Sequence, residues 1–348
     1  MDKENVLDDT QYKNLLKQIE DRIDLGVAEA AKSVVKNQLS TYWDMGKYIV
    51  EFEQEGKIYA EYGLELLKKL ARDLTLRKGR GYSRPNLYNM RKFYLTYPEG
   101  ISDLIGLTWS HFCELMRIDN ELERHFYEQE CLAQKWNVRT LRKQKERALF
   151  LRIASEKDKE GVLALANQGI IVEKPEDAIR DTYTLEFLNV EGNGLKDEND
   201  LEKRIIRNLE TFLLELGKGF TFVKEQYPMR VNNSTYKCDL VFYHRILKCF
   251  FLIDLKIGAV EHKDIGQMNM YMGYFAEEVN EPDDNPPIGM VLAREKDELL
   301  VKYATYGMDS NLFVSKYELY LPNEEELKQL VNNIIIDSEN AGQGDEAE

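Results

Sequence analysis

The chain has 348 residues, of which 43% are hydrophobic and 31% charged, a composition that indicates a folded globular protein and excludes a disordered one. No stretch approaches the roughly eighteen apolar residues of a membrane span, so we expect no membrane partner. The formal net charge of −15 is unevenly spread: residues 1–170 hold 28 basic and 27 acidic side chains, and residues 171–348 hold 19 and 35. A nearly neutral first half leaves a nucleic-acid partner open.

Four cysteines are scattered along the chain, with no Cys-x-x-Cys pair. Together with only four histidines, this argues against structural zinc. Reduced thiols in a cytoplasmic protein are the simplest interpretation.

Helical patterns dominate the first half, and strand patterns are nearly absent before Ile170. Apolar side chains recur at the spacing of amphipathic helices. These segments are residues 21–52, 62–76, 109–116, 121–133, 138–151 and 157–167. We therefore predict an all-α N-terminal domain over residues 1–170, with a role in DNA binding, in oligomerisation or in both.

Basic residues concentrate in two windows of this half, residues 72–92 and 135–152. Each window holds seven Lys or Arg residues against a single acid. Such clusters neutralise phosphates and bind nucleic acid without regard to its sequence. The candidate nucleic-acid-binding residues are Arg77, Lys78, Arg80, Arg84, Arg91, Lys92, Arg139, Arg142 and Lys143.

The first basic window also has the pattern of two helices joined by a glycine turn. A helix over residues 62–76 precedes Lys78-Gly-Arg-Gly, and Ser83 is a plausible N-cap for a second helix with Pro85 in its first turn. This pattern is compatible with a DNA-reading helix-turn-helix. The alternative is an αα-hairpin in a bundle whose Lys and Arg side chains are simply solvated.

The second half changes character after loop-like sequences, which predict a linker over residues 171–198. Beyond it, helix and strand patterns mix. We predict helices at 200–216, 262–279 and 323–335, and strands at 220–231, 236–243, 248–257, 288–294, 299–305 and 312–319. They describe an α/β domain over residues 199–336, a mixed sheet flanked by helices, followed by a disordered acidic tail at 337–348.

Two acids stand in neighbouring apolar strands of this domain, Asp239 and Asp254. Lys256 lies two residues after Asp254 and therefore points to the same face. A carboxylate pair beside an ammonium is suited to holding a divalent metal and an activated water. The alternative is an Asp-x-Lys pair on a solvated surface. The apolar sequence before Asp254 argues against that alternative, because a buried carboxylate is costly unless it is paired or metal-bound.

Further polar residues share faces with apolar ones on two predicted helices. Glu202 falls inside the apolar arc of the helix at 200–216, so it is aimed at the interior; it could equally be an acid favoured by the helix dipole. Gln267 and Tyr271 are four residues apart and share one helix face. They are candidate supports for a phosphate or for Lys256.

The order of an acidic helix, an Asp-bearing strand, an Asp-x-Lys strand and a Gln-x-x-x-Tyr helix resembles the PD-(D/E)XK nuclease superfamily, and within it the YhcG-like bacterial family. The resemblance implies a restriction-endonuclease-like fold behind a helical domain. It also implies catalytic roles for Glu202, Asp239, Asp254, Lys256, Gln267 and Tyr271. Two departures stand out: Cys238 replaces the proline of the motif name, and Asp254 stands where many relatives have Glu.

From this resemblance we expect a DNA endonuclease that requires Mg2+ or Mn2+, acts on duplex or branched DNA and leaves a 5′-phosphate. Asp239, Asp254 and Glu202, with the backbone carbonyl of Leu255, would hold the metal. The family is compatible with phage defence and with recombination or repair. One alternative is an inactive nuclease fold that serves as a nucleic-acid-binding or assembly module. Another is a helical interaction protein with an unrelated α/β domain.

Overall fold

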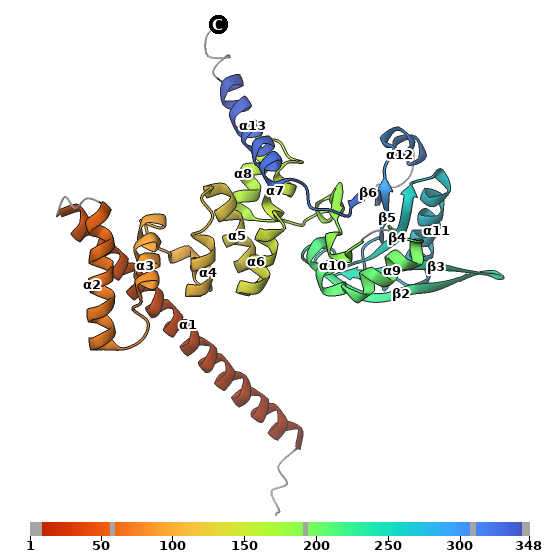
Figure 1. Ribbon diagram of the computed structural model, residues 1–348. Coiled ribbons are helices and arrows are strands. Elements are labelled where there is room, and N and C mark those ends of the chain that lie inside the picture. The colour runs from red at the N-terminus through yellow and green to blue at the C-terminus, as the bar shows by residue number, and fades with distance from the viewer. Residues whose placement is uncertain (1–8, 56–59, 191–193, 307–310, 343–348) are drawn as a thin grey trace, which may run out of the picture. The chain divides into compact units, whose positions relative to one another are not determined.

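The computed structural model describes residues 9–55, 60–190, 194–306 and 311–342, and the chain divides into two compact units, residues 1–146 and 147–348. Figure 1 shows helices alone in the first unit and a sheet with flanking helices in the second. Among the described residues, none of the helices combines the length and the apolar content needed to cross a bilayer.

The first unit is built on a long helix against which a shorter helix packs. Its α-helices are α1 (Asp9–Glu55), α2 (Ala60–Lys78), α3 (Arg84–Thr96), α4 (Trp109–Leu115), α5 (Glu121–Gln134) and α6 (Val138–Glu146). Leu87, Met90 and Phe93 of α3 are fully buried. Gly46 of α1 permits the close approach, since a Cβ there would collide with the carbonyl of Met90.

The second unit contains a six-stranded mixed sheet in the order β1-β6-β5-β4-β3-β2. The strands β4, β5, β6 and β1 run parallel, and β2 and β3 are antiparallel additions at the edge. The strands are β1 (Thr182–Thr184), β2 (Phe220–Val231), β3 (Ser234–His244), β4 (Cys249–Ala259), β5 (Ile288–Glu295) and β6 (Leu312–Glu318). The helices are α7 (Leu149–Ala154), α8 (Lys159–Gln168), α9 (Glu198–Arg207), α10 (Leu209–Leu216), α11 (His262–Glu278), α12 (Glu298–Ala304) and α13 (Glu324–Gly342).

Both faces of this sheet are covered, which explains the nearly continuous apolar runs of β4 and β5. Phe242 and Ile253 point to one face, where α9 and α10 pack. Val241 and Leu252 point to the other face, against Phe275 of α11. The alternation follows from the period of two along a strand. The predicted α/β domain behind an all-α domain is confirmed.

The segment 299–305, which we predicted to be a strand, is instead helical up to Ala304, as part of helix α12. Asp297 caps this helix by accepting hydrogen bonds from the backbone N–H groups of Leu299 and Leu300. The apolar contacts of the segment come from Leu300, Val301 and Ala304, which is helical spacing. The N-cap and this spacing outweigh the β-propensity of a short apolar run.

Other boundaries differ from prediction at the ends of elements. The expected helix at 200–216 is broken at Asn208 into α9 and α10. The expected disordered tail begins at residue 337, but α13 continues to Gly342, and residues 343–348 lie outside the described residues.

The segment 171–198, which we expected to be a linker, supplies part of the second unit. Its strand β1 pairs with β6 at the sheet edge, and Tyr183 is fully buried. The change of unit falls earlier, between Glu146 and Arg147.

A buried ion cluster fixes this segment to α10. Glu215 is fully buried, and its carboxylate lies 2.7 Å from Arg152, 3.0 Å from Arg147 and 3.5 Å from Arg180. The backbone N–H of Thr184 also donates to Glu215, at 2.8 Å. Burial by itself would raise the pKa of Glu215, but the surrounding guanidinium groups hold that pKa below its usual value.

Candidate active site

The candidate site lies where strands β3 and β4 separate. Their ladder ends at the pair Leu240 and Ile253, so continuing the register by one residue sets Asp239 opposite Asp254. Beyond this point the backbone N–H of Leu255 donates to the carboxylate of Asp239, at 2.8 Å. The Asp239 side chain thus accepts the hydrogen bond that a backbone carbonyl of β3 would accept if the ladder continued. We call the separation of β3 and β4 beyond Leu240 and Ile253 the fork, and the two predicted aspartates lie together at it.

Lys256 joins Asp254 on the same face of β4. Its Nζ lies 2.8 Å from Oδ2 of Asp254, 3.8 Å from Asp264 and 3.9 Å from Glu198. Asp254 is only 2% exposed, and its Oδ2 accepts no hydrogen bond of good geometry from the described residues. The contact with Lys256 is therefore an ion pair at a buried oxygen with spare capacity to bind.

Gln226 connects the third acid to this pair. Its Nε2 donates to Glu202 at 2.7 Å and to Asp239 at 3.0 Å. Gln226 has φ +46°, a left-handed backbone conformation that is uncommon for a residue other than glycine. Non-glycine residues in this region cost on the order of 1 kcal/mol and cluster at functional sites. The backbone is therefore held in a strained form that aims one amide at two carboxylates.

Gln267 and Tyr271 of α11 stand at the other side of Asp254, as their shared helix face predicts. Gln267 donates to Asp254 at 3.5 Å and also hydrogen-bonds the hydroxyl of Tyr271. The Tyr271 hydroxyl in turn donates to the carbonyl of Lys237 on β3, at 2.9 Å. These contacts tie α11 to both strands of the fork.

Three carboxyl groups of the site, those of Asp239, Asp254 and Glu202, have raised pKa values and are harder to ionise than in water. Burial, and then the charge of Asp239, raises the pKa of Asp254 to about 6. Burial also raises the pKa of Asp239 and that of Glu202. Burial would lower the pKa of Lys256, but the ion pair with Asp254 outweighs it and the pKa is raised. Burial is the first cause of each raised carboxyl pKa, so the site disfavours carboxylate charge that no cation balances.

The donor set fits a divalent cation of the hard, oxygen-preferring kind. Two aspartates and a glutamate offer carboxylate oxygens, and Oδ2 of Asp254 is buried without a hydrogen bond from the described residues. Within the described ranges, however, no three Asp, Glu, His or Cys side chains are already gathered at ligand spacing. Glu202 reaches Asp239 through the amide of Gln226 and not directly.

Three residues that the sequence did not single out belong to this constellation: Glu198, Gln226 and Asp264. Gln226 carries no sequence signal, because its role depends on a left-handed turn of the backbone inside a strand. Asp264 does carry one, since its carboxylate accepts from the backbone N–H of Glu261 in a capping box at the start of α11.

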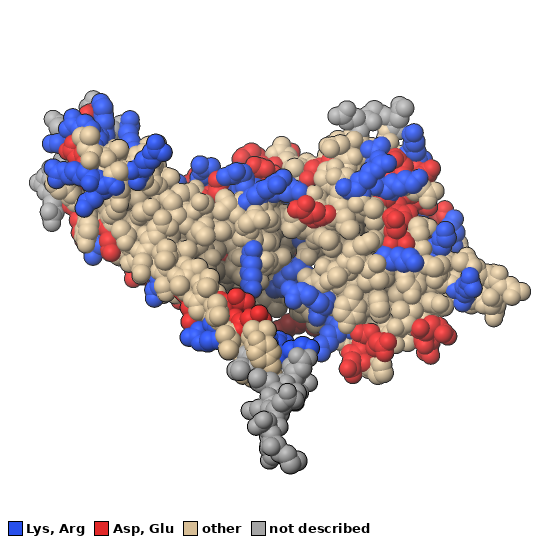
Figure 2. Space-filling model, turned by 90° about the horizontal axis from the view of Figure 1, so that it is seen from below, with Lys and Arg blue, Asp and Glu red and all other residues tan. Residues whose placement is uncertain are grey.

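The candidate nucleic-acid-binding residues lie in the first unit and differ in solvent exposure and in ion pairing with acidic side chains. Arg77, Lys78, Arg80 and Arg84 are exposed at the end of α2, in the turn and at the start of α3. Figure 2 shows Lys and Arg side chains crowded at the left of the molecule, over the end where Figure 1 places α2 and α3.

Other members of the predicted basic set, apart from Arg139, are engaged with acids or partly covered. The guanidinium of Arg91 lies 2.7 Å from Glu53, and that of Arg142 lies 2.6 Å from the buried Glu114. Lys92 and Lys143 are half-buried, whereas Arg139 is exposed.

The helix pair α2 and α3 matches the predicted helix, turn and helix. Ser83 has the extended backbone of an N-cap but makes no side-chain cap hydrogen bond. The turn is instead closed by Asn86, whose side chain donates to the carbonyl of Gly81. The contacts of α3 within the first unit are compatible both with a DNA reader and with a plain αα-hairpin.

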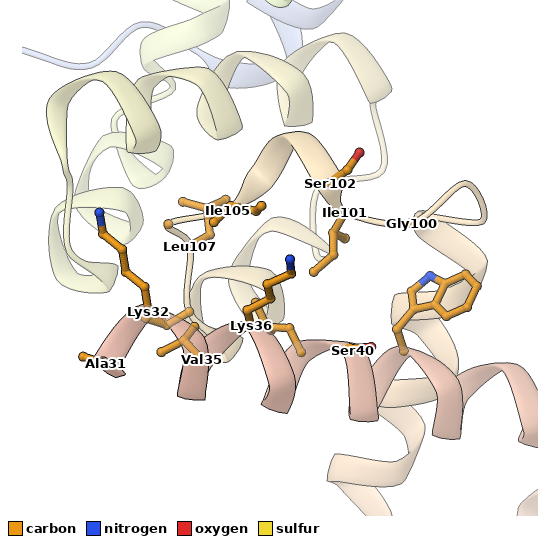
Figure 3. A pocket seen from close by; sticks show the side chains of 14 residues that line it. Ala31, Lys32, Val35, Lys36, Ser40, Gly100, Ile101, Ser102, Ile105 and Leu107 are labelled. Atoms are coloured by element: carbon orange, nitrogen blue, oxygen red, sulfur yellow. The ribbon is translucent and has the colours of Figure 1, made fainter. Parts of the chain in front are cut away.

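The first unit contains a cavity of about 440 Å3 whose lining differs from the carboxylate-rich candidate site. Figure 3 shows Lys32 and Lys36 of α1 facing Ile101, Ile105 and Leu107 across it. Its lining is apolar apart from these lysines and a few hydroxyls, and it contains no carboxylate. The cavity therefore lacks the ligands of a metal centre.

Comparison with known proteins matches both halves of the chain. The YhcG PDDEXK nuclease domain matches residues 176–332, and the DUF1016 N-terminal domain matches residues 18–152. The Escherichia coli K12 protein named "Putative nuclease YhcG" is 37% identical over 343 residues, which cover 88% of this chain and 89% of that protein.

Two solved structures share weaker likeness. A repair endonuclease from Pyrococcus abyssi covers 37% of this chain and 50% of its own, with 15% identity and a TM-score of 0.26. The EndoMS-dsDNA2 complex covers 38% of this chain and 48% of its own, with the same identity and TM-score.

Proposed function

This chain belongs to the YhcG family of nuclease-domain proteins, and from that premise we propose that it is a DNA endonuclease dependent on Mg2+ or Mn2+. The observation that carries the proposal is the meeting of Asp239, Asp254 and Lys256 at the fork of β3 and β4. Phosphodiester hydrolysis needs charge neutralisation at the phosphate and an oriented water. The fork offers carboxylates for the first need and an ammonium for the second.

Asp239 and Asp254 would hold the cation. Glu202 and the backbone carbonyl of Leu255 would be further oxygen donors, a set of the kind that Mg2+ and Mn2+ prefer. When bound, the cation would neutralise phosphate charge and lower the pKa of water. The buried, partly unsatisfied Oδ2 of Asp254 supports this assignment.

Lys256 would orient the attacking water. Its raised pKa keeps the ammonium charged near neutral pH, so it would donate hydrogen bonds and would not take up a proton. Gln267 and Tyr271 would act as positioning residues, because they contact Asp254 and the carbonyl of Lys237 and so fix the two strands of the fork.

The helical unit would bind duplex or branched DNA. Arg77, Lys78, Arg80 and Arg84 are exposed together, and none of them forms an ion pair with a described acidic side chain. Exposed cations of this kind supply the salt-dependent part of DNA affinity.

Helix α1 would join two copies of the chain. Tyr12, Leu16, Ile19 and Ile23 are between 41% and 59% exposed on α1. Their alternating spacing of four and three residues is typical of the seam of a coiled coil. An exposed helix with such a seam gains stability mainly by packing, and the same seam on a second copy supplies a matching surface.

We place the protein in the cytoplasm because its four cysteines are free thiols. Phage defence and DNA recombination or repair are the settings in which such an enzyme would act.

Cleavage of supercoiled plasmid with Mg2+ or Mn2+ tests the proposed activity. We expect nicking by the wild type, loss of nicking in Asp254→Asn, and normal nicking in the control Asp283→Asn, which changes an exposed aspartate of the same unit. Equal activity of wild type and Asp254→Asn would remove this site from the reaction. If both proteins leave the plasmid uncut, the non-catalytic alternative stands.

A further inference from the structure

The β2–β3 hairpin extends beyond the rest of the sheet. Pairing of β3 with β4 stops at Leu240, but β2 and β3 continue to pair as far as Val231 and Ser234. Figure 1 shows this hairpin running past the other strands to a free turn. We call residues 227–237 the hairpin arm.

The hairpin arm is anchored at its base and exposed beyond it. Met229 is buried in the core beneath α11, as is Cys238 directly after the arm. Every residue of the range 230–237 is exposed apart from the half-buried Val231. The arm is therefore fixed in direction by the core, while its outer surface is available to a partner.

The arm and its approach are basic in an otherwise acidic half of the chain. Lys224, Arg230 and Lys237 are exposed, and Glu225 is the only acid between residues 224 and 238. Within the described residues, no ion pair joins these three cations to an acidic side chain. Figure 2 shows Lys or Arg side chains (blue) on the protrusion at the right of the molecule. Such a local excess favours an anionic partner.

The tip adds groups that can contact bases. Residues 232–235 are Asn, Asn, Ser and Thr, and the ring of Tyr236 is 38% exposed. Asparagine and hydroxyl side chains form hydrogen bonds with base edges as well as with phosphates. The arm therefore combines cations that suit the phosphates of a nucleic acid with hydrogen-bonding groups that suit its base edges.

The arm begins at the candidate active site. Gln226 immediately precedes it on β2, and Asp239 follows it on β3. The hydroxyl of Tyr271 donates to the carbonyl of Lys237, which couples the arm to α11. Asp239 lies six residue steps along the chain from Asn233 in the turn, a span of about 20 Å. A polymer with a phosphate at Asp239 therefore lies within reach of the arm.

We infer that the hairpin arm enters the major groove of double-stranded DNA beside the phosphate that is cut. This inference rests on the proposed function and narrows its substrate to duplex DNA. The major groove of B-form DNA, about 12 Å wide, admits a two-stranded β-ribbon. The major groove of duplex RNA is too deep and narrow for side chains to read. Single-strand binders use several stacked aromatic rings, whereas the arm exposes Tyr236 alone as a large ring.

Binding by the full chain in an Asp254→Asn background tests the inference without cleavage. We compare the double variant Arg230→Ala/Tyr236→Ala with Arg245→Ala/Ile246→Ala. The latter removes one exposed cation and one exposed apolar side chain at the opposite end of β3. Fluorescence anisotropy is measured with a 30-base-pair DNA duplex, the matching single strand and the matching RNA duplex over a range of salt concentrations.

We call Arg230→Ala/Tyr236→Ala in the Asp254→Asn background the arm variant. Its affinity for duplex DNA should fall by about tenfold or more, and its slope of log K against log salt should be shallower by about one. Its affinity for single strand and for RNA duplex should stay within twofold, and the control should match wild type throughout. Unchanged affinity for duplex DNA, or an equal loss for all three nucleic acids, would overturn the inference.

Interference by N7-methylated guanine locates the contact, because this atom faces the major groove. Methylation near the bound phosphate should weaken wild-type binding but not binding by the arm variant. An identical interference pattern in both proteins would reject the groove assignment. Near-identical thermal melting of the two proteins is the folding control.

Failure of the arm and failure of the nuclease activity give different results. If wild type cuts plasmid but Arg230→Ala/Tyr236→Ala, made without the Asp254→Asn change, cuts equally well and the arm variant binds duplex DNA as tightly as its Asp254→Asn parent, the inference falls and the proposed function stands. If wild type cuts no better than Asp254→Asn but the arm variant still loses duplex affinity selectively, the arm is a duplex reader in a protein that does not use this site for hydrolysis.

Discussion

Gln226 donates a hydrogen bond to Asp239 at 3.0 Å from a backbone that is left-handed at φ +46°. The same amide nitrogen reaches Glu202 at 2.7 Å, so one neutral side chain donates to two carboxylates whose charges repel each other. Because a left-handed backbone at a glutamine costs free energy, we expect that the conformation of Gln226 serves the function of this site.

Replacing Gln226 by Ala should lower plasmid cleavage by about 10- to 100-fold, the usual effect of losing a group that orients a metal ligand. Gln226→Asn retains an amide group, and asparagine adopts a left-handed backbone more readily than most residues, so this variant should retain more activity than Gln226→Ala. The control Gln329→Ala changes an exposed glutamine on α13. If Gln226→Ala cleaves at the wild-type rate, Gln226 is not part of the machinery.

Lys256→Met should abolish cleavage, by at least about a hundredfold, because it removes the group proposed to orient the water. It should also destabilise the fold by on the order of 3 kcal/mol in urea unfolding, since Asp254 is left buried without its ion-pair partner. The double variant Asp254→Asn/Lys256→Met should recover stability but not activity. Cleavage by the double variant would contradict the proposed roles.

Acid should unfold the second unit partly through Glu215. Because the folded-state pKa of Glu215 is lowered, its stabilising contribution is complete above the unfolded-state pKa, about 4.3. That contribution is lost as the pH falls below this value. We expect the melting temperature to drop as the pH falls from about 5 to 3, and the drop to be smaller in Glu215→Gln. The same slope in both proteins would show that the cluster does not govern acid stability.

The variant Glu215→Gln should also be less stable at pH 7. Its amide cannot balance the charges of Arg147, Arg152 and Arg180, which are all within 3.5 Å of the carboxylate. Urea unfolding at pH 7 measures this loss. Glu210→Gln, an exposed glutamate at the start of the same helix, is the control and should leave stability unchanged.

Substituting Arg77, Lys78 and Arg80 together by Ala should weaken DNA binding and reduce the slope of log K against log salt by about two to three. Arg142→Ala should have a smaller effect, because the guanidinium of Arg142 is already held by Glu114. Binding is measured by anisotropy over a salt titration. Unchanged affinity and an unchanged salt slope in the triple variant would exclude the α2–α3 turn as a DNA contact.

Substituting Leu16 and Ile23 together by Glu should convert an oligomer to a monomer in sedimentation-velocity experiments. Charges at the seam of a coiled coil oppose packing of the two helices. The control Asn14→Glu/Asp21→Asn alters α1 without touching the seam. A wild-type protein that sediments as a monomer at micromolar concentration would contradict the proposed association.

The sequence determined the fold class, because apolar periodicity depends on local geometry that every residue carries with it. It also indicated Asp239, Asp254 and Lys256 as neighbours, since strand pairing and a period of two decide which side chains share a face. The family resemblance, which comparison confirmed, added the helical domain and the nuclease domain.

Only the tertiary structure decided what lies around these residues. Residues 299–305 could form a strand or a helix, and packing of Leu300 and Val301 against the core of the second unit selects α12. Gln226, Asp264 and Glu198 come to the fork from separate elements, and their approach depends on a strained backbone, a helix cap and long-range packing. The hairpin arm exists because β4 leaves β3 at Leu240 while β2 stays paired, a difference between two ladders that no single segment encodes.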